Sequence, residues 1–261
     1  MEKEIVHIHQ VVTRLPELRF AEPVEWRICE GEQWAVVGPN GAGKTLLADI
    51  LQRKFAFREG EVCYNKEGKV SDIIRSIAFK DIYSLADCRN SYYQQRWHAT
   101  ESDDVPTVPE TLSAYEGTEN LKEVLHIFGI EDLLPKKLIY LSSGDLSKFL
   151  IVRTLLSRPE ILILDNPFIG LDAPSRDLLV DMLGQLSHLH GVQVILLLSN
   201  PADIPDMITH VLPIAGKKCY PPMSREAFLA DTALIQILFP EENWMQTALP
   251  VDPNKQPATH E

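Results

Sequence analysis

Residues 38–45 read Gly-Pro-Asn-Gly-Ala-Gly-Lys-Thr, and these residue types at this spacing are typical of a loop that binds phosphate. Small residues let backbone N–H groups close around phosphate oxygens, and a helix that begins after the loop adds favourable partial charge. In such a loop Lys44 can reach the β- and γ-phosphates of a nucleoside triphosphate, and the Thr45 hydroxyl can bind Mg²⁺. The candidate phosphate contacts are Gly38, Asn40, Gly41, Ala42, Gly43, Lys44 and Thr45.

The sequence on both sides of this loop fits its chemistry. Residues 34–37 (Trp-Ala-Val-Val) predict a buried strand, and the run from about Gly43 to Arg53 predicts a helix. A glycine-rich turn with a chance Lys-Thr pair is the alternative, but it does not account for both flanking elements. The sequence therefore predicts that the chain binds a nucleoside triphosphate.

A carboxylate stands at the end of a second apolar strand. Residues 161–164 (Ile-Leu-Ile-Leu) predict a central parallel strand, and Asp165 follows it. Proteins with a phosphate loop hold Mg²⁺, directly or through water, with an acid at such a strand end. Thr45 and Asp165 are thus the candidate metal ligands, although an aspartate in this position can also simply cap the next turn.

A third stretch, residues 141–145 (Leu-Ser-Ser-Gly-Asp), comes just before a predicted helix. Ser142 and the N–H groups around Gly144 would form another helix start that can bind an anion. Alone this signal is weak, because the same pattern is an ordinary helix cap. Because the stretch lies shortly before Asp165, the interpretation as an anion-binding helix start is favoured.

Strands alternate with helices around the phosphate loop, which predicts an α/β fold with a mostly parallel central sheet. An N-terminal antiparallel β portion is expected before the loop, and a mostly helical subdomain is expected over about residues 82–158. One domain is expected over residues 1–249, with a single helix from about 225 to 238. The Pro-rich, polar residues 250–261 are expected to be a disordered tail.

Composition narrows the function classes. The net charge of -12 argues against a large nucleic-acid surface, which needs a concentrated basic patch, so no nucleic-acid partner is expected. The N-terminus lacks the features of a signal peptide, and the apolar runs are too short to cross a bilayer. A cytoplasmic protein is expected, peripheral at most to the inner face of a membrane through a partner. His7 and His9 are interpreted as exposed strand residues, with a metal site as the alternative.

The ordered set GPNGAGKT, LSSGD and ILILDNPFIGLD (residues 38–45, 141–145 and 161–172) resembles the nucleotide-binding domain of the ATP-binding-cassette (ABC) ATPases. The resemblance covers about residues 4–215 and is closest to the N-terminal half of tandem-cassette proteins of the molybdenum-transport type. It implies a P-loop NTPase fold of the ABC type, with ATP and Mg²⁺ as cofactors.

The resemblance also implies a head-to-tail dimer with a second cassette, either a second copy or a different chain. Each ATP then lies between one chain's phosphate loop and the other chain's signature. On that pattern Ser142 and Gly144 contact the γ-phosphate bound to the partner, and Asp172 lies at the dimer interface. Membrane permease subunits are the further partners that the resemblance implies.

Two departures from the family pattern bear on hydrolysis. Asn166 stands where the family has a Glu that polarises the attacking water, and Asn200 stands where it has a His that contacts the γ-phosphate. An amide cannot accept a proton, and water-orienting or general-base groups contribute about 10²–10⁴ in rate. The resemblance therefore implies a degenerate catalytic site, and whether the chain is an ATPase enzyme stays open.

The signature and one further position depart as well. Ser143 and Asp145 replace the usual Gly and Gln or Glu, while Ser142 and Gly144 are retained. Lys80-Asp81 stands where a glutamine usually follows a strand, and Gln94 and Gln95, which come later, are interpreted as ordinary helix residues. This chain's signature is therefore expected to be able to complete a site on a partner.

Three functions follow as hypotheses. The first is an ABC-type ATP-binding subunit that acts with a second cassette in membrane transport and hydrolyses ATP weakly. The second is a soluble regulatory ATP-binding protein with no permease. The third, a DNA-repair or translation-factor cassette, is disfavoured by the acidic balance.

Overall fold

A computed structural model describes residues 3–79, 107–115 and 119–240, and its centre is a sheet of seven strands. The strand order is β10-β8-β3-β7-β6-β5, with β9 against β8. Five strands are parallel, and β9 and β10 pair antiparallel with β8. The bounds are β3 Trp34–Val37, β5 Ile74–Ala78, β6 Ile161–Asp165, β7 Gln193–Leu198, β8 His210–Ala215, β9 Lys218–Cys219 and β10 Met223–Ser224.

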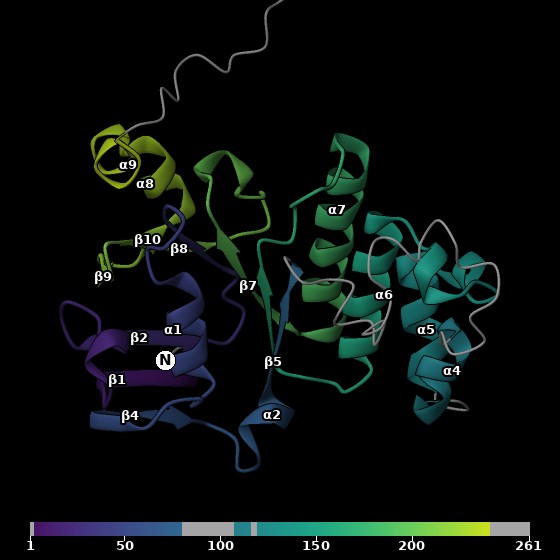
Figure 1. The fold of residues 1–261 in the computed structure, drawn as a ribbon, viewed down its shortest axis with the longest axis horizontal. Coiled ribbons are helices and arrows are strands. Elements are labelled where there is room, and N and C mark those ends of the chain that lie inside the picture. The colour runs from purple at the N-terminus through teal and green to yellow at the C-terminus, as the bar shows by residue number, and fades with distance from the viewer. Residues whose placement is uncertain (1–2, 80–106, 116–118, 241–261) are drawn as a thin grey trace, which may run out of the picture.

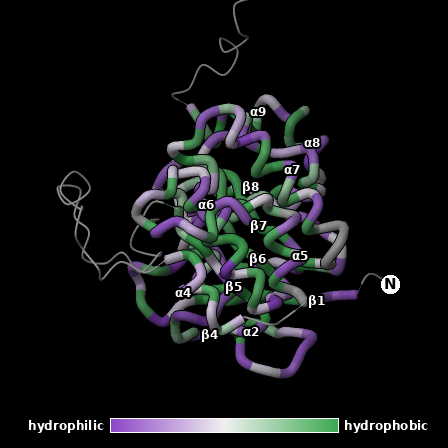
Figure 2. The backbone as a smooth tube through the Cα atoms, turned by 90° about the vertical axis from the view of Figure 1, so that its right-hand side faces the viewer, coloured by the Kyte–Doolittle hydropathy of each residue, from purple (hydrophilic) through white to green (hydrophobic). Residues whose placement is uncertain are grey.

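The parallel strands are apolar along their length because both faces of the sheet are covered. In β6, Ile161 and Ile163 belong to one hydrophobic core, whereas Leu162 and Leu164 belong to the other. Residues of β3 and β7 divide between the two cores in the same alternating way. Figure 2 shows the hydrophobic residues concentrated on β6, β7 and β8 in the middle of the molecule.

One face of the central sheet is covered by helix α1, Lys44–Leu51, and by a second sheet of three antiparallel strands (Figure 1). These strands are β1 Glu4–Thr13, β2 Val24–Cys29 and β4 Phe57–Tyr64, in the order β2-β1-β4. Val6 and Ile8 of β1 are buried, while His7 and His9 between them point to the opposite side of the strand. The short helix α2, Val70–Ile73, leads from this sheet into β5.

The other face is covered by helices, of which three are long: α5 Glu119–Phe128, α6 Ser143–Leu155 and α7 Ala173–His190. A short helix α4, Val108–Leu112, comes before them, and 3₁₀ turns cover Ser113–Tyr115, Glu131–Leu133 and Leu138–Tyr140. The described part of the expected helical subdomain is thus helical. Gln94 and Gln95, Lys80-Asp81 and the rest of residues 80–106 lie outside the described residues.

The prediction of a single helix over residues 225–238 is wrong in one respect, because the segment forms two helices. Helix α8 is Arg225–Ala230, and α9 is Thr232–Leu238. The Asp231 backbone N–H ends α8 by donating to Ala227, and its side chain begins α9 by accepting from the N–H of Leu234 at 2.9 Å. The expected tail, residues 250–261, lies outside the described residues. Within the described ranges, no helix has both the length and the apolarity needed to cross a bilayer.

Candidate nucleotide site

Residues 38–43 connect β3 to α1 in a turn that depends on its glycines. Gly41 and Gly43 have φ of +78° and +111°, in the left-handed region that side chains disfavour. Gly38 is required for a different reason. A Cβ atom on Gly38 would lie 1.9 Å from the backbone oxygen of Ile214 in β8. The neighbouring strand therefore fixes where the loop begins.

Lys44, the first residue of α1, turns its side chain back into this loop. Its Nζ donates hydrogen bonds to the carbonyl oxygens of Gly38 at 2.6 Å and Pro39 at 3.0 Å. The side chain is buried, and this burial lowers the pKa of Lys44 to about 8, against the opposing effect of the Asp165 carboxylate. The ammonium group is thus already held in the concave side of the loop, where it can exchange carbonyl oxygens for phosphate oxygens.

A hydrogen-bonded chain joins the loop to the ends of β6 and β7. The Thr45 hydroxyl donates to Asp165 Oδ2 at 2.7 Å, and Asn166 Nδ2 donates to Asp165 Oδ1 at 3.0 Å. The Ser199 hydroxyl lies 3.1 Å from Asn166 Oδ1 and 2.9 Å from Asn40 Oδ1. Both predicted metal ligands, Thr45 and Asp165, are therefore in direct contact, and the chain returns to the phosphate loop at Asn40.

The backbone of Asn166 also has a special conformation. Its φ is +53°, and its N–H donates to the carbonyl oxygen of Leu197 at 3.0 Å. Asparagine tolerates the left-handed region better than most residues. Backbone and side chain together hold the Asn166 amide beside the Asp165 carboxylate, so it has little freedom to reorient.

The residues of the LSSGD stretch, 141–145, lie away from the phosphate loop. Ser142 caps α6, because its Oγ accepts from the N–H of Asp145 at 3.1 Å. Asp172 caps α7 in the same way, by accepting from the N–H of Ser175 at 3.0 Å. The two helix starts are neighbours, since a Cβ atom on Gly144 would lie 3.4 Å from Ser175 Oγ. Figure 1 shows α6 and α1 on opposite sides of the central strands.

The structure also contains two contacts of the site that the sequence reasoning missed. Ser199, and not the predicted Asn200, takes part in the hydrogen-bonded chain; the Asn200 side chain accepts from the N–H of Ala202 at 2.7 Å. Lys217 contacts the loop, because its backbone N–H donates to the Ala42 carbonyl oxygen at 2.9 Å. Ser199 could have been found, since it directly follows a buried parallel strand, as Asn166 does.

Phe20 and Trp26, two aromatic side chains of the N-terminal segment, could each stack on an adenine ring, but they differ in their surroundings. Trp26 is 2% exposed and belongs to the core between the two sheets, away from the phosphate loop. Phe20 is partly buried beside the loop, and a Cβ atom on Gly43 would lie 3.3 Å from its ring. Only Phe20 of this pair lies close to the phosphate loop.

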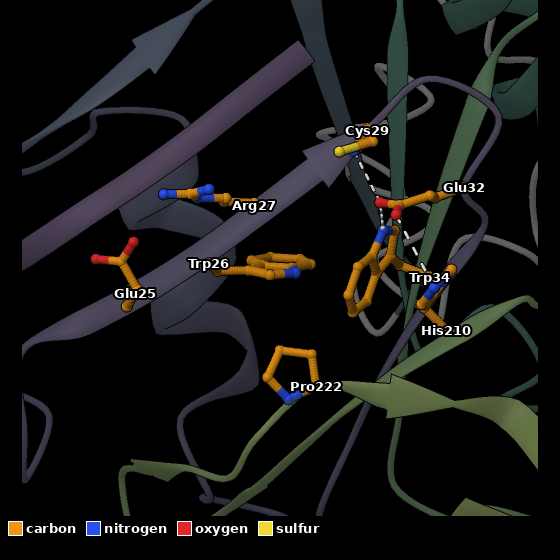
Figure 3. Close-up of a pocket in the computed structure, with 8 residues that line it drawn as sticks. All are labelled: Glu25, Trp26, Arg27, Cys29, Glu32, Trp34, His210 and Pro222. Atoms are coloured by element: carbon orange, nitrogen blue, oxygen red, sulfur yellow. Dashed lines mark hydrogen bonds and ion pairs between the residues drawn. The ribbon is translucent and has the colours of Figure 1, made fainter. Parts of the chain in front are cut away.

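A separate cleft of about 510 Å³ lies at the other end of the strands (Figure 3). Trp34 and His210, the first residues of β3 and β8, stack at 5.0 Å between ring centroids and line this cleft with Trp26 and Pro222. The phosphate loop follows the last residue of β3. The cleft is therefore separate from the candidate nucleotide site.

Comparison with known proteins assigns the sequence that forms this site to a family. The profile of the family described as ABC transporter matches residues 21–169, which are more than half of the chain and include the phosphate loop and Asp165. This chain belongs to the ABC transporter family. The sequence-based assignment to this family and the predicted fold class, an α/β P-loop NTPase with an antiparallel β portion, are confirmed.

Relatives and solved structures of this ABC family member agree with that assignment. An uncharacterised ABC transporter ATP-binding protein of Schizosaccharomyces pombe is 30% identical over 219 residues, which cover 80% of this chain and 45% of that protein. The ABC transporter ATP-binding protein ModF of Escherichia coli is 28% identical over 246 residues, which cover 91% and 48%. The chain thus spans about half the length of these two relatives.

The fold neighbours are cassettes as well. The structure of cbiO1 from Clostridium perfringens, described as part of the ABC transporter complex cbiONQ, superposes with a TM-score of 0.72 at 17% identity and covers 92% of this chain and 97% of that one. The ADP conformation of the ATP-binding cassette MJ1267 has a TM-score of 0.67 at 16% identity, with 90% and 98% covered. These likenesses show the fold.

The lowered pKa of Lys44 predicts how stability of the nucleotide-free chain depends on pH. Between about pH 8 and the ordinary value of 10.5, the unfolded chain keeps a proton that native Lys44 has lost. The unfolded state then binds more protons, so the free energy of unfolding rises with pH in this window. Chemical denaturation from pH 7.5 to 10 measures this rise, and Lys44→Met is expected to reduce it. An identical pH dependence in both proteins would show that Lys44 is not the group responsible.

Proposed function

We propose that this chain binds Mg-ATP as one half of a two-cassette unit of an ABC-type transport system and hydrolyses it slowly. The binding half of the proposal rests on the loop and its neighbours. Lys44 supplies a cation inside the loop, and the contact between Thr45 and Asp165 brings together two oxygen ligands of the kind that Mg²⁺ prefers. On this proposal Thr45 and Asp165 would hold Mg²⁺. The Mg²⁺ ion and the Lys44 ammonium group would then bind the phosphates of ATP.

The observation that carries slow hydrolysis is the environment of Asn166. Its amide nitrogen donates to Asp165, and its amide oxygen lies at hydrogen-bond distance from Ser199. An amide cannot act as a base, and this one is already engaged on both sides. Asn200 likewise carries no charge, and its oxygen caps the next turn. Asn166 and Asn200 therefore offer no group that accepts the proton of an attacking water.

A second cassette is supported by the position of the other predicted phosphate contacts. Ser142 caps α6 and Gly144 lies in its first turn; this helix of 13 residues is on the far side of the central strands from the loop. The start of such a helix attracts anions. A phosphate held there would therefore come from a nucleotide on another cassette. Two relatives of about twice this chain's length agree with a unit made of two cassettes.

Association in the presence of nucleotide tests this arrangement. Sedimentation velocity with and without Mg-ATP should show a nucleotide-dependent complex, with a second copy or with a different cassette. Ser142→Ala is expected to weaken that complex by about tenfold or more, because a hydrogen bond to a charged group is lost. Ser224→Ala is the matched control, since Ser224 caps α8 in the same way, with the Ala227 N–H at 3.2 Å. Equal weakening by both substitutions, or association without nucleotide, would count against the shared site.

A soluble regulatory protein that binds ATP without a permease is the second candidate. The absence of a basic group at Asn166 favours it, because a regulator needs nucleotide binding more than turnover. Purification of the chain from its native membrane and soluble fractions distinguishes the two. A co-purifying membrane subunit supports transport, whereas a second cassette alone supports regulation.

A further inference from the structure

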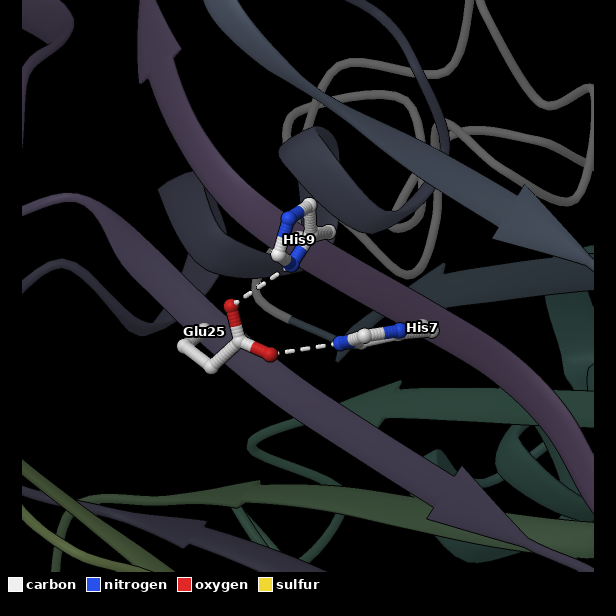
Figure 4. Close-up of side chains that lie close together, drawn as sticks. All are labelled: His7, His9 and Glu25. Atoms are coloured by element: carbon white, nitrogen blue, oxygen red, sulfur yellow. Dashed lines mark hydrogen bonds and ion pairs between the residues drawn. The ribbon is translucent and has the colours of Figure 1, made fainter.

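Three side chains that no nucleotide function requires come together on the outer face of the antiparallel sheet. His7 and His9 lie two residues apart on β1, and Glu25 lies on the adjacent strand β2 (Figure 4). Alternation along a strand places His7 and His9 on the same face. Figure 4 shows the carboxylate of Glu25 between the two imidazole rings, with one oxygen turned toward each.

The ligand atoms of this cluster are close enough to share one ion. Glu25 Oε1 lies 2.5 Å from His7 Nε2, and Glu25 Oε2 lies 3.2 Å from His9 Nδ1. One ligand atom from each of the three residues lies within 4.8 Å of the other two. Tetrahedral zinc, with bonds of about 2.0–2.2 Å, needs ligand atoms about 3.3 Å apart. Side-chain rotations are sufficient to reach that spacing, because His9 is 58% exposed and Glu25 is 39% exposed.

Gln10 orients the carboxylate of Glu25, and a second carboxylate lies near the ring of His7. The backbone N–H of Gln10 and its side-chain amide donate to Glu25 Oε2 at 3.1 Å and 3.0 Å. Gln10 sits at a break in strand register with φ of +47°, and such a bulge re-aims the groups around it. Glu4 Oε1 lies 3.9 Å from His7 Nδ1, on the side of the ring away from Glu25. A carboxylate on the far side of the ring is typical of metal-binding histidines, and here it lies beyond hydrogen-bond distance.

Charge also makes the cluster suitable for a cation. Partial burial opposes ionisation of Glu25, but hydrogen bonds from His7 and Gln10 outweigh it and hold its pKa at about 2. Glu25 is therefore a carboxylate at neutral pH. Arg27 is an unfavourable neighbour, because its Nε lies 3.4 Å from His7 Nε2. Its side chain is 65% exposed and can move into solvent.

From this arrangement we propose that His7, His9 and Glu25 bind a divalent transition-metal ion of the zinc class on the outer face of the antiparallel sheet. Two imidazoles and one carboxylate suit zinc and its first-row neighbours, whereas Mg²⁺ and Ca²⁺ prefer oxygen ligands alone. Water completes the coordination on the exposed side. The ion links β1 to β2 and is independent of the nucleotide, which occupies the loop at the end of β3.

Zinc titration of the full chain tests the site. The protein is freed of metal with a chelator, the chelator is removed, and ZnCl₂ is titrated calorimetrically without nucleotide. One equivalent is expected to bind, and millimolar Mg²⁺ or Ca²⁺ is expected not to displace it. His9→Gln and Glu25→Gln are each expected to weaken zinc binding by more than about tenfold, the smallest effect usual for a group around a metal. The unfolding temperature of each variant without metal shows whether it still folds.

Three further variants test whether the zinc binds at this cluster and not at a neighbouring histidine or thiol. Arg27→Gln is expected to strengthen zinc binding, a gain that loss of folding cannot produce. His126→Gln is the matched control, because His126 pairs with the carboxylate of Glu131 at 3.3 Å, outside this cluster, and its loss should leave the affinity unchanged. Cys63→Ser is also expected to keep the affinity, although Cys63 pairs across the strands with His7. No stoichiometric binding, or loss of binding in His126→Gln or Cys63→Ser, would overturn the proposal.

Discussion

Replacing Lys44 with Met is expected to weaken Mg-ATP binding by roughly 10- to 100-fold, the range that loss of a hydrogen bond to a charged group implies. The side chains have similar length, but Met cannot donate to a phosphate oxygen or balance its charge. The native ammonium group is already turned into the loop toward the carbonyl oxygens of Gly38 and Pro39, so binding needs little rearrangement of it. Equilibrium titration with a fluorescent ATP analogue measures the loss.

Unfolding is not expected to account for that loss. Lys44→Met removes two hydrogen bonds to loop carbonyls, but it also removes a charged group whose burial is unfavourable. Lys54→Met is the matched control. Lys54 is an exposed residue just beyond the end of the same helix, paired with Asp49 at 2.8 Å. Normal nucleotide affinity in Lys44→Met, or an equal loss in Lys54→Met, would contradict the assigned role.

Replacing Asn166 with Glu is expected to raise ATP turnover by about 10²–10⁴, the contribution of a positioned general base. Turnover is measured at a protein concentration at which the nucleotide-dependent complex is fully formed. Asn166→Gln is the matched control, because Gln has the length of Glu but cannot accept a proton. A rise confined to Glu shows that basicity is what the native site lacks. Equal rates in the two variants would contradict this.

The gain in turnover is expected to come with a loss of stability. Glu at the φ of +53° of Asn166 costs about 1 kcal/mol more than Asn, because only a few residue types tolerate this region. The substitution also removes the hydrogen bond that the Asn166 amide donates to Asp165 and puts two carboxylates side by side. A lower denaturation midpoint without Mg²⁺ is the expected sign of this strain.

The phosphate loop and the strand that ends at Asp165 could be predicted because their chemistry is local in sequence. The loop needs small residues between a strand and a helix, and the metal-binding acid needs an apolar strand before it. Thr45 and Asp165 are in contact because β3, which leads into the loop, and β6 are parallel strands of one sheet with β7 between them, and their carboxyl ends lie at the same edge. The same reasoning extends to Ser199, which follows β7.

Other features depend on contacts between distant segments. Gly38 is required by the backbone of Ile214 in β8, a strand that the sequence reasoning did not identify. The interpretation of His7 and His9 as exposed strand residues, and not as metal ligands, depended on strand alternation alone. It could not include Glu25, whose carboxylate reaches both rings because β1 pairs antiparallel with β2, with Ile8 opposite Trp26. The break between α8 and α9 depends on one residue, Asp231, and aspartate is a preferred N-cap residue, so this break had a local signal in the sequence.

A single-turnover experiment on the unmodified chain tests the central proposal most directly. The protein, in excess and fully associated, is mixed with a small amount of Mg-ATP, and bound nucleotide and released phosphate are followed in the same sample. The account predicts that ATP binds saturably and remains intact on the complex long after binding is complete. Prompt hydrolysis of the bound ATP would show that Asn166 does not limit the reaction, and the proposal of a binding-competent but slowly hydrolysing site would be wrong.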